Sequence, residues 1–161
     1  MSQNQPLTNK HIMVTRPAHQ ASKLIHLLEQ AGAQVYCQPL IEIIAIDKPI
    51  TAIERVKKLN TTDIVIFISQ NAVTHGMQLI QQQGTLPAQL KLATVGLGSA
   101  SLLETLTNRP VDIIPQNAYN SESLLAHPAL QNVDGKTITI FRGIGGRNLL
   151  AETLRERGAQ V

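Results

Sequence analysis

The chain has 161 residues, of which 43% are hydrophobic and 16% are charged, and its formal net charge is +3. A chain this apolar and this weakly charged is not intrinsically disordered. Its single cysteine, Cys37, excludes an intrachain disulfide framework, and no apolar run is long enough to form a transmembrane helix. The polar residues 1–7 lack the apolar segment of a secretory signal. We therefore expect a cytoplasmic protein of one domain, or of one domain and a fragment.

The composition also disfavours binding of nucleic acids and of metals. Aromatic residues make up 2% of the chain and Trp is absent, so few side chains are available to stack on bases. The basic residues are dispersed, with no run longer than Lys57-Lys58, which leaves only a mild bias toward anionic partners. None of the five histidines stands at a metal-ligand spacing from a carboxylate or from Cys37.

The first part of the chain predicts one strand, one helix and an extended segment. Residues 11–15 are a short apolar run, and the leucines of residues 18–31 recur at helical spacing until Gly32, a common helix stop. Residues 34–46 are extended and contain Pro39, which has no N–H to donate to a sheet. We interpret this extended stretch as a connecting strand and not as a central strand.

The rest of the chain alternates strand and helix patterns. Apolar runs predict strands at 63–68, 90–95, 111–114 and 136–141, and residues 159–161 begin another. Helical patterns occupy 52–59, 72–83, the segment through Leu102 and Leu106, the segment opened by Ser121, and the segment from Leu149 to Gly158. This alternation predicts an α/β fold with a parallel sheet that is covered on both faces.

Small or polar residues follow several of the predicted strands, which is where ligands bind in parallel sheets. The junctions are Ser69-Gln70-Asn71, Gly96 to Ser99, Asn117 to Ser123, and Gly143 to Arg147. Each places backbone N–H groups at the start of a helix, where anions bind. The same residue types are also ordinary helix caps that require no ligand. Neither glycine-containing junction matches a P-loop or a dinucleotide-binding fingerprint.

Three arginines are candidates for binding an anion. Arg16 and Arg142 directly follow apolar strands, and Arg147 opens the next predicted helix. A guanidinium group carries five donors in a fork that fits carboxylate or phosphate, so such a cluster suits a ligand with several carboxylates. The alternative is that all three are solvated loop charges. Glu122 is interpreted as a charge favoured by the dipole at a helix start, not as an acid catalyst.

Six segments occur in a set order along the chain. They are Val14-Thr-Arg-Pro17, Pro39-Leu-Ile-Glu-Ile43, Ile66-Phe-Ile-Ser-Gln-Asn-Ala-Val73, Thr94-Val-Gly-Leu-Gly-Ser-Ala100, Ser121-Glu-Ser-Leu-Leu125, and Phe141-Arg-Gly-Ile-Gly-Gly-Arg147 with Leu150, Leu154 and Arg157-Gly158-Ala159. In this order they resemble the amino-terminal part of the uroporphyrinogen-III synthase family. Two positions depart from the family pattern, because Ile68 replaces the usual Thr and Ser99 stands where Thr is frequent.

The resemblance implies a bilobed α/β protein made of two flavodoxin-like lobes with parallel sheets. Residues 1–35 are then the first βα unit of a discontinuous lobe one, residues 36–47 a connecting strand, and residues 48–161 a lobe two that lacks its last strand. A lone βα unit cannot cover the apolar face of its helix, residues 18–31. We therefore expect a truncated chain whose exposed apolar surface favours self-association through that helix.

The activity implied by the resemblance is the cyclisation of hydroxymethylbilane to uroporphyrinogen III, with inversion of the last pyrrole ring, in tetrapyrrole (haem) biosynthesis. The family uses no cofactor or metal, and its partner is a tetrapyrrole polycarboxylate, not a nucleic acid or a membrane. The residues expected to bind this substrate are Arg16, Ser69, Gln70, Asn71, Gly98, Ser99, Arg142 and Arg147, and no catalytic residue is assigned. A truncated chain is expected to be weakly active or inactive alone. The alternative is a non-catalytic flavodoxin-like module that binds an anion or a partner.

Overall fold

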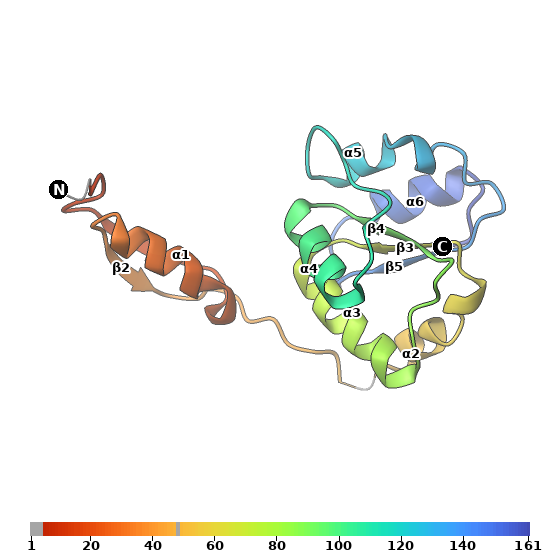
Figure 1. Cartoon of the computed structure of the whole chain (residues 1–161), viewed down its shortest axis with the longest axis horizontal. Helices are drawn as coiled ribbons and strands as arrows, with labels where there is room; N and C mark the ends of the chain where they lie inside the picture. The colour runs from red at the N-terminus through yellow and green to blue at the C-terminus, as the bar shows by residue number, and fades with distance from the viewer. Residues whose placement is uncertain (1–4, 48) are drawn as a thin grey trace. The chain divides into compact units, whose positions relative to one another are not determined.

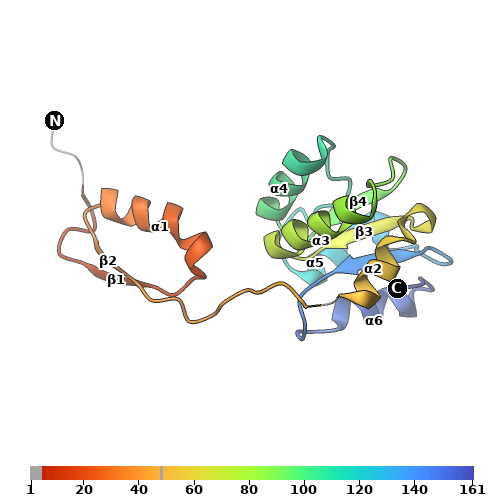
Figure 2. The same cartoon turned by 90° about the horizontal axis from the view of Figure 1, so that it is seen from below.

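The computed structural model describes residues 5–47 and 49–161, and the chain divides into two compact units. Unit 1 covers residues 1–46 and unit 2 covers residues 47–161 (Figure 1 and Figure 2). In each unit, helical segments pack on strands that all run parallel, so the expected α/β class is confirmed. The assignment of the two units to lobes stays a prediction.

The part of unit 1 that the structure describes contains two strands and one helix. β1 (His11–Val14) pairs in parallel with β2 (Gln34–Cys37), and α1 (Ala18–Gln30) connects them. The start of the extended segment is thus paired with β1, while the division into a first βα unit (1–35) and a connecting strand (36–47) stays a prediction. Gly32 has a φ of +92° and turns the chain back after α1, which brings β2 alongside β1. The pairing gives partners to backbone groups that a lone strand would leave without them.

The small sheet of unit 1 has one covered face and one open face. Val14 and Ala21 are buried where α1 covers the sheet, at 3% and 1% exposure. Met13 and Tyr36 lie on the other face and remain 64% and 49% exposed, because successive side chains of a strand alternate in direction. On α1 itself, Leu27 is exposed. Unit 1 thus presents apolar surface, while self-association through that surface stays a prediction.

Unit 2 is a parallel sheet with helices on both faces. Its elements in chain order are α2 (Ile50–Val56), a 3-10 turn (Leu59–Thr61), β3 (Ile64–Phe67), α3 (Gln70–Gln83), β4 (Lys91–Thr94), α4 (Leu97–Thr107), α5 (Ser121–Leu125), a 3-10 turn (Pro128–Leu130), β5 (Ile138–Phe141) and α6 (Leu149–Glu156). The three strands lie in the order β4-β3-β5. The chain thus passes from the central strand β3 to β4 on one side and later to β5 on the other.

Two predicted strands are reduced to isolated bridges. Ile113 makes one parallel bridge beside β4, and Gln160 makes another beside the residue that precedes β5. In the first of these segments the carboxylate of Asp112 accepts a β4 N–H, that of Leu92, at 2.8 Å. A side chain therefore takes a place that the main chain of a full strand would fill, and the regular ladder does not extend to 111–114.

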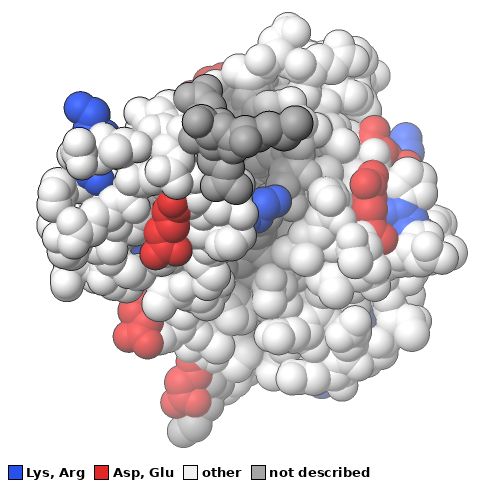
Figure 3. Space-filling view, turned by 60° about the vertical axis from the view of Figure 1, so that its left-hand side comes forward, with Lys and Arg blue, Asp and Glu red and all other residues white. Residues whose placement is uncertain are grey.

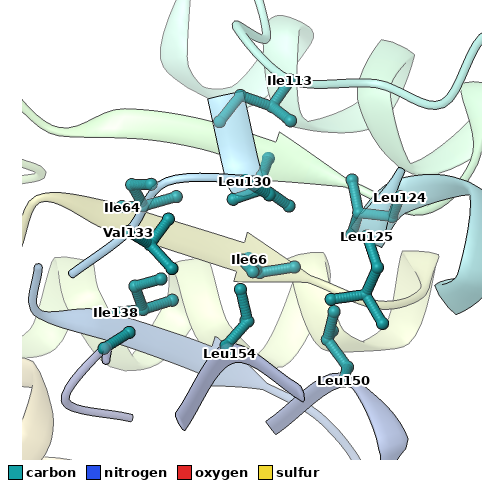
Figure 4. Close-up of a cluster of buried hydrophobic side chains, with 12 residues drawn as sticks. Ile64, Ile66, Ile113, Leu124, Leu125, Leu130, Val133, Ile138, Leu150 and Leu154 are labelled. Atoms are coloured by element: carbon teal, nitrogen blue, oxygen red, sulfur yellow. The ribbon is translucent and has the colours of Figure 1, made fainter. Parts of the chain in front are cut away.

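The alternation of side chains along β3 divides the core of unit 2 into two clusters. Ile64 and Ile66 belong to the cluster under α5 and α6, whereas Val65 and Phe67 belong to the cluster under α2, α3 and α4. All four side chains are buried, which explains why the strand is uniformly apolar. Figure 4 shows the first cluster, in which leucines of α6 point toward the strands.

Gly76 allows α3 to lie against a pair of stacked aromatic rings. Phe67 of β3 and Phe141 of β5 stack with their ring centroids 4.9 Å apart and their planes 10° apart. A β-carbon at Gly76 would lie 2.8 Å from each ring, closer than real β-carbon contacts come. Because α3 starts directly after β3, this contact also fixes where residues 69–71 stand above the sheet.

Gly76→Ala is expected to destabilise unit 2 by about 1–3 kcal/mol, because the added methyl group overpacks the contact with the two rings. This loss outweighs the better helix propensity of alanine, worth about 1 kcal/mol. Thermal unfolding followed by circular dichroism measures the change. The matched control is Gln82→Ala at an exposed position of the same helix, which is expected to leave Tm nearly unchanged. A Gly76→Ala protein as stable as the wild type would contradict the close approach of α3.

Asp63 ties together the amino ends of β3 and β5. One carboxylate oxygen accepts the N–H of Thr137 at 2.8 Å, and the other lies 3.2 Å from the ammonium of Lys136. The backbone hydrogen bond from Thr137 is the main cause that holds the pKa of Asp63 below its ordinary value of 3.8, and Lys136 acts in the same direction.

Acid should therefore weaken unit 2 through Asp63. A carboxyl group whose pKa is lower in the folded chain stabilises fully above its unfolded pKa, and this contribution is lost as the pH falls through the folded pKa. We expect the Tm of Asp63→Asn to fall less steeply than that of the wild type between about pH 5 and pH 2. The difference is modest because the carboxylate is 41% exposed. Glu152→Gln, a control on exposed α6 surface, should keep the wild-type profile, and identical slopes for Asp63→Asn and the wild type would refute the linkage.

Candidate functional site

In the sheet of unit 2, the chain first adds a strand on one side of the central strand and later adds one on its other side. β3 is followed by β4 on one side, while β5 lies on the other side of β3. α3, which leaves β3, and α6, which leaves β5, cover opposite faces. In open α/β sheets, ligands bind beyond the carboxyl ends of the strands at such a reversal. The carboxyl ends of β3 and β5 are therefore the place to look for a site.

A cavity of about 150 Å³ lies at this place. Its lining includes Ile68 after β3, Ile140 of β5, and Arg142 and Arg147 from the loop after β5. Ligand pockets for molecules of drug size span roughly 300–1,000 Å³. The cavity is thus large enough for one side group of a ligand and too small to enclose a tetrapyrrole.

A larger hollow of about 560 Å³ lies at the opposite edge, at the amino ends of the strands. It is lined by residues 60–64, Gln89, Lys91 and residues 129–136 in part. Its size alone does not make it the better candidate, since parallel sheets direct helix N-termini and their free N–H groups to the carboxyl edge. We therefore place the candidate site at the carboxyl edge.

The junction between β3 and α3 is held by its own side chains. The Ser69 hydroxyl caps α3 and accepts the N–H of Ala72 at 3.1 Å. The Gln70 carboxamide donates to the carbonyl of Gly98 at 3.2 Å and so joins this junction to the next one. Asn71 also has an interaction partner in the structure. These polar side chains, expected to bind a substrate, have structural partners, and substrate binding by them stays a prediction.

The junction between β4 and α4 starts a second helix beside α3. Gly98 leaves the space that the Gln70 side chain fills, since a β-carbon there would lie 2.9 Å from the Gln70 Nε2 atom. Ser99 is 6% exposed, and its N–H donates to the carbonyl of Gly96 at 3.1 Å. Its backbone therefore forms the first turn of α4, while the burial of Ser99 limits how far its hydroxyl is open to solvent.

The loop after β5 is organised by Arg142. The guanidinium donates to the carbonyls of Gly143, Gly145 and Arg147 and, at 3.1 Å, to the Oδ1 atom of Asn148. Gly145, like its neighbour Gly146, has a φ of +81°, which a residue with a side chain rarely adopts. Most of the N–H donors of Arg142 therefore hold the shape of this loop. The sequence pattern did not predict this role.

Arg147 pairs with a carboxylate from another element. Its guanidinium contacts Glu122 of α5 at two points, 2.5 Å and 3.2 Å, in a side-by-side geometry. The hydrogen bond from Arg147 is the main cause that lowers the pKa of Glu122, and the carboxylate in turn raises the pKa of Arg147. Glu122 indeed stands in the first turn of α5. The sequence suggested no pairing, because 25 residues separate the partners.

The structure gathers most of the candidate residues at one edge. Ser69, Gln70, Asn71, Gly98, Ser99, Arg142 and Arg147 follow the carboxyl ends of the three strands of unit 2. Arg16 belongs to unit 1, where it is exposed just after β1, and no other described residue bonds to its guanidinium. On the face drawn in Figure 3, the basic side chains form no broad patch, and those at the right lie beside acidic side chains. Recognition of an anion there would rest on individual groups and not on a broad basic patch.

Two searches of the described residues complete the account of the site. Within residues 5–47 and 49–161, no three His, Cys, Asp or Glu side chains come together as ligands for a metal ion. In the same part of the chain, every helix is too short or too polar to cross a membrane.

Comparison with known proteins identifies relatives of this chain. Residues 22–161 match the family model described as uroporphyrinogen-III synthase HemD. Proteins named uroporphyrinogen-III synthase from Proteus mirabilis, Salmonella typhimurium and Escherichia coli are 38%, 36% and 34% identical to it. Each alignment covers 93% of this chain, but 75% of the first relative and 61% of the other two. The chain thus spans about three fifths of the length of most of these relatives.

Solved structures show a similar fold. Two crystal structures of uroporphyrinogen III synthase from Thermus thermophilus, one wild type and one mutant, match with TM-scores of 0.59 and 0.70. They are 18% identical to this chain, and the matches cover 94% of it and 59% of theirs, so they support the fold. The assignment to a family rests on the family model and on the curated relatives. These findings confirm the resemblance seen in the sequence. The chain belongs to the uroporphyrinogen-III synthase family.

Proposed function

We propose that this chain contributes to the cyclisation of hydroxymethylbilane to uroporphyrinogen III, with inversion of the last pyrrole ring, in haem biosynthesis. The observation that supports this most is that helix starts and Arg147 stand together at the carboxyl edge of one parallel sheet. The proposed substrate carries carboxylates around its edge. Backbone N–H groups and guanidinium groups are the donors that such a polyanion requires.

The chemistry we propose needs little more than positioning. Loss of the substrate's hydroxymethyl hydroxyl as water leaves an azafulvene, which closes through a spiro intermediate and rearranges. A flexible tetrapyrrole must be held in a curled shape so that its two ends meet. Holding the reacting groups in place lowers the activation free energy of ring closure by a large amount. The first N–H groups of α3 and α4 lie outside the hydrogen-bond ladders of their helices and carry partial positive charge. In the proposal they hold carboxylates, and no side chain is assigned as an acid or base.

The arrangement of the whole protein is part of the same proposal. Unit 2 would be lobe two of a bilobed flavodoxin-like protein, and unit 1 the start of lobe one. Arg16 would then be the residue of unit 1 that binds the substrate. A cytoplasmic location and association of copies through α1 belong to this proposal as well.

A non-catalytic binding module is the second candidate. Two observations favour it: Arg142 and Arg147 are already engaged by groups of the protein, and the cavity beside them is small. Such a module would bind a small carboxylate or a partner at this edge and would catalyse no reaction.

The test of the proposed function is the conversion of freshly made hydroxymethylbilane, with type I and type III products separated by chromatography. The assay compares this chain with a form extended to the length of the curated relatives. We expect the extended form to give the type III product in excess over the spontaneous type I product. If both forms yield type I alone, the catalytic proposal is wrong and the binding module takes its place.

Ser99→Ala is expected to lower kcat/KM of an active form about tenfold, the equivalent of one lost hydrogen bond to a charged group, with little change in Tm. Ser69→Ala should instead lower stability by about 1 kcal/mol, because it removes the cap of α3. Ser101→Ala, an exposed serine on the same helix as Ser99, is the matched control and should change neither. Loss of stability without loss of activity in Ser99→Ala would remove Ser99 from the site.

A further inference from the structure

The ion pair between Arg147 and Glu122 stands at the rim of the candidate site. Arg147 and Ser121, the neighbour of Glu122, both line the 150 Å³ cavity at the carboxyl edge. The two donors of Arg147 meet the two oxygens of Glu122 at 2.5 Å and 3.2 Å. This is the geometry in which a guanidinium holds any carboxylate. Glu122 thus occupies the position that a carboxylate of a ligand would take.

The pair is also easy to open. The side chains of Arg147 and Glu122 are 67% and 49% exposed even while they are paired. Ion pairs this open to water contribute little to stability, because water solvates the separated charges well. Glu122 stands in the first turn of α5, where the positive end of the helix dipole favours its charge without any partner. Release of Glu122 from Arg147 therefore costs little.

Arg142, the other arginine of the rim, differs from Arg147 in this respect. Its partners are three backbone carbonyls and the Oδ1 atom of Asn148, all within the loop that it organises. A ligand that took Arg142 would have to unfold this loop. Arg147 has a side-chain carboxylate from another element as its partner, and that side chain can rotate away. Of the two arginines, only Arg147 can change its partner without a movement of the backbone.

We propose that Glu122 is an internal competitor that occupies Arg147 until a carboxylate of the ligand displaces it. The inference rests on the proposed function, since it takes the ligand at this edge to be a polycarboxylate. A polycarboxylate wins the exchange because its other carboxylates are held nearby at the same time, which raises the effective concentration of the one beside Arg147. A ligand with one carboxylate has no such help and does not displace Glu122. Glu122 thereby selects for ligands with several carboxylates.

The test measures binding of uroporphyrin I, a fluorescent porphyrin with eight carboxylates, by fluorescence titration of the full chain. Glu122→Gln is expected to lower Kd about two- to fivefold, the scale of an exposed ion pair that no longer has to be broken. Acetate, with one carboxylate, should compete for Arg147 more effectively in Glu122→Gln than in the wild type. Glu156→Gln removes the same charge from the far end of α6 and is the matched control, with an expected Kd equal to that of the wild type.

Three further variants separate competition from a general effect of charge. Arg147→Gln should weaken binding of uroporphyrin I. Adding Glu122→Gln to Arg147→Gln should not raise the affinity, because the guanidinium for which the carboxylates compete is gone. Glu122→Asp keeps the charge but is one methylene shorter, so it should fall between the wild type and Glu122→Gln. If the wild type binds and Glu122→Gln binds equally or more weakly, the competition is refuted and the proposed site stands. If no variant binds uroporphyrin I, the polycarboxylate site and the competition are both wrong.

Discussion

The parallel pairing of β3 with strands on both sides is the constraint on which the rest of unit 2 depends. β4 and β5 satisfy the backbone groups on its two edges, and helices cover both its faces. Residues Ile64–Phe67 must therefore all be apolar, because none of them reaches water. The same pairing places the loops after all three strands at one edge. The candidate site is thus a consequence of how the central strand is buried.

The polar residues at that edge act first on the protein itself. Ser69 caps a helix, Gln70 joins two junctions, and Arg142 shapes a loop. What remains for an anion is the set of backbone N–H groups at helix starts, together with Arg147, whose partner can move away. In the proposed function, such an edge would bind through the arrangement of its loops more than through free charges. That suits a reaction in which holding a flexible substrate in one shape is most of the task.

Most strands and helices of unit 2 could be predicted because their signals are local. The apolar run before Ser69 and the leucines of α6 report burial directly, and each covers several consecutive residues. The pairing of β2 with β1 was not predicted, because Pro39 lies just after β2 and its partner β1 is 20 residues away in sequence. The segment at 111–114 looked like a strand, yet the Asp112 side chain takes one of its bonds.

The place of most candidate residues in the fold was predictable, but their contacts were not. Its residues could be located because they directly follow predicted strands. The pairing of Arg147 with Glu122 and the hold of Arg142 on its loop could not be read from the sequence. Both depend on side chains that meet only after the chain has folded, and neither leaves a periodic pattern. For the same reason a solvated loop charge and a loop-organising arginine look alike in a sequence.

The central claim, that the carboxyl edge of this sheet binds a polycarboxylate, is tested most directly by nuclear magnetic resonance. Backbone amide shifts of the isotope-labelled chain would be followed while uroporphyrin I is added. The account predicts that the largest changes fall in residues 69–71, 97–99 and 143–148, at the helix starts and the loop after β5. Changes centred instead on residues 60–64, 89–91 and 129–136, around the larger hollow at the amino ends of the strands, would contradict it.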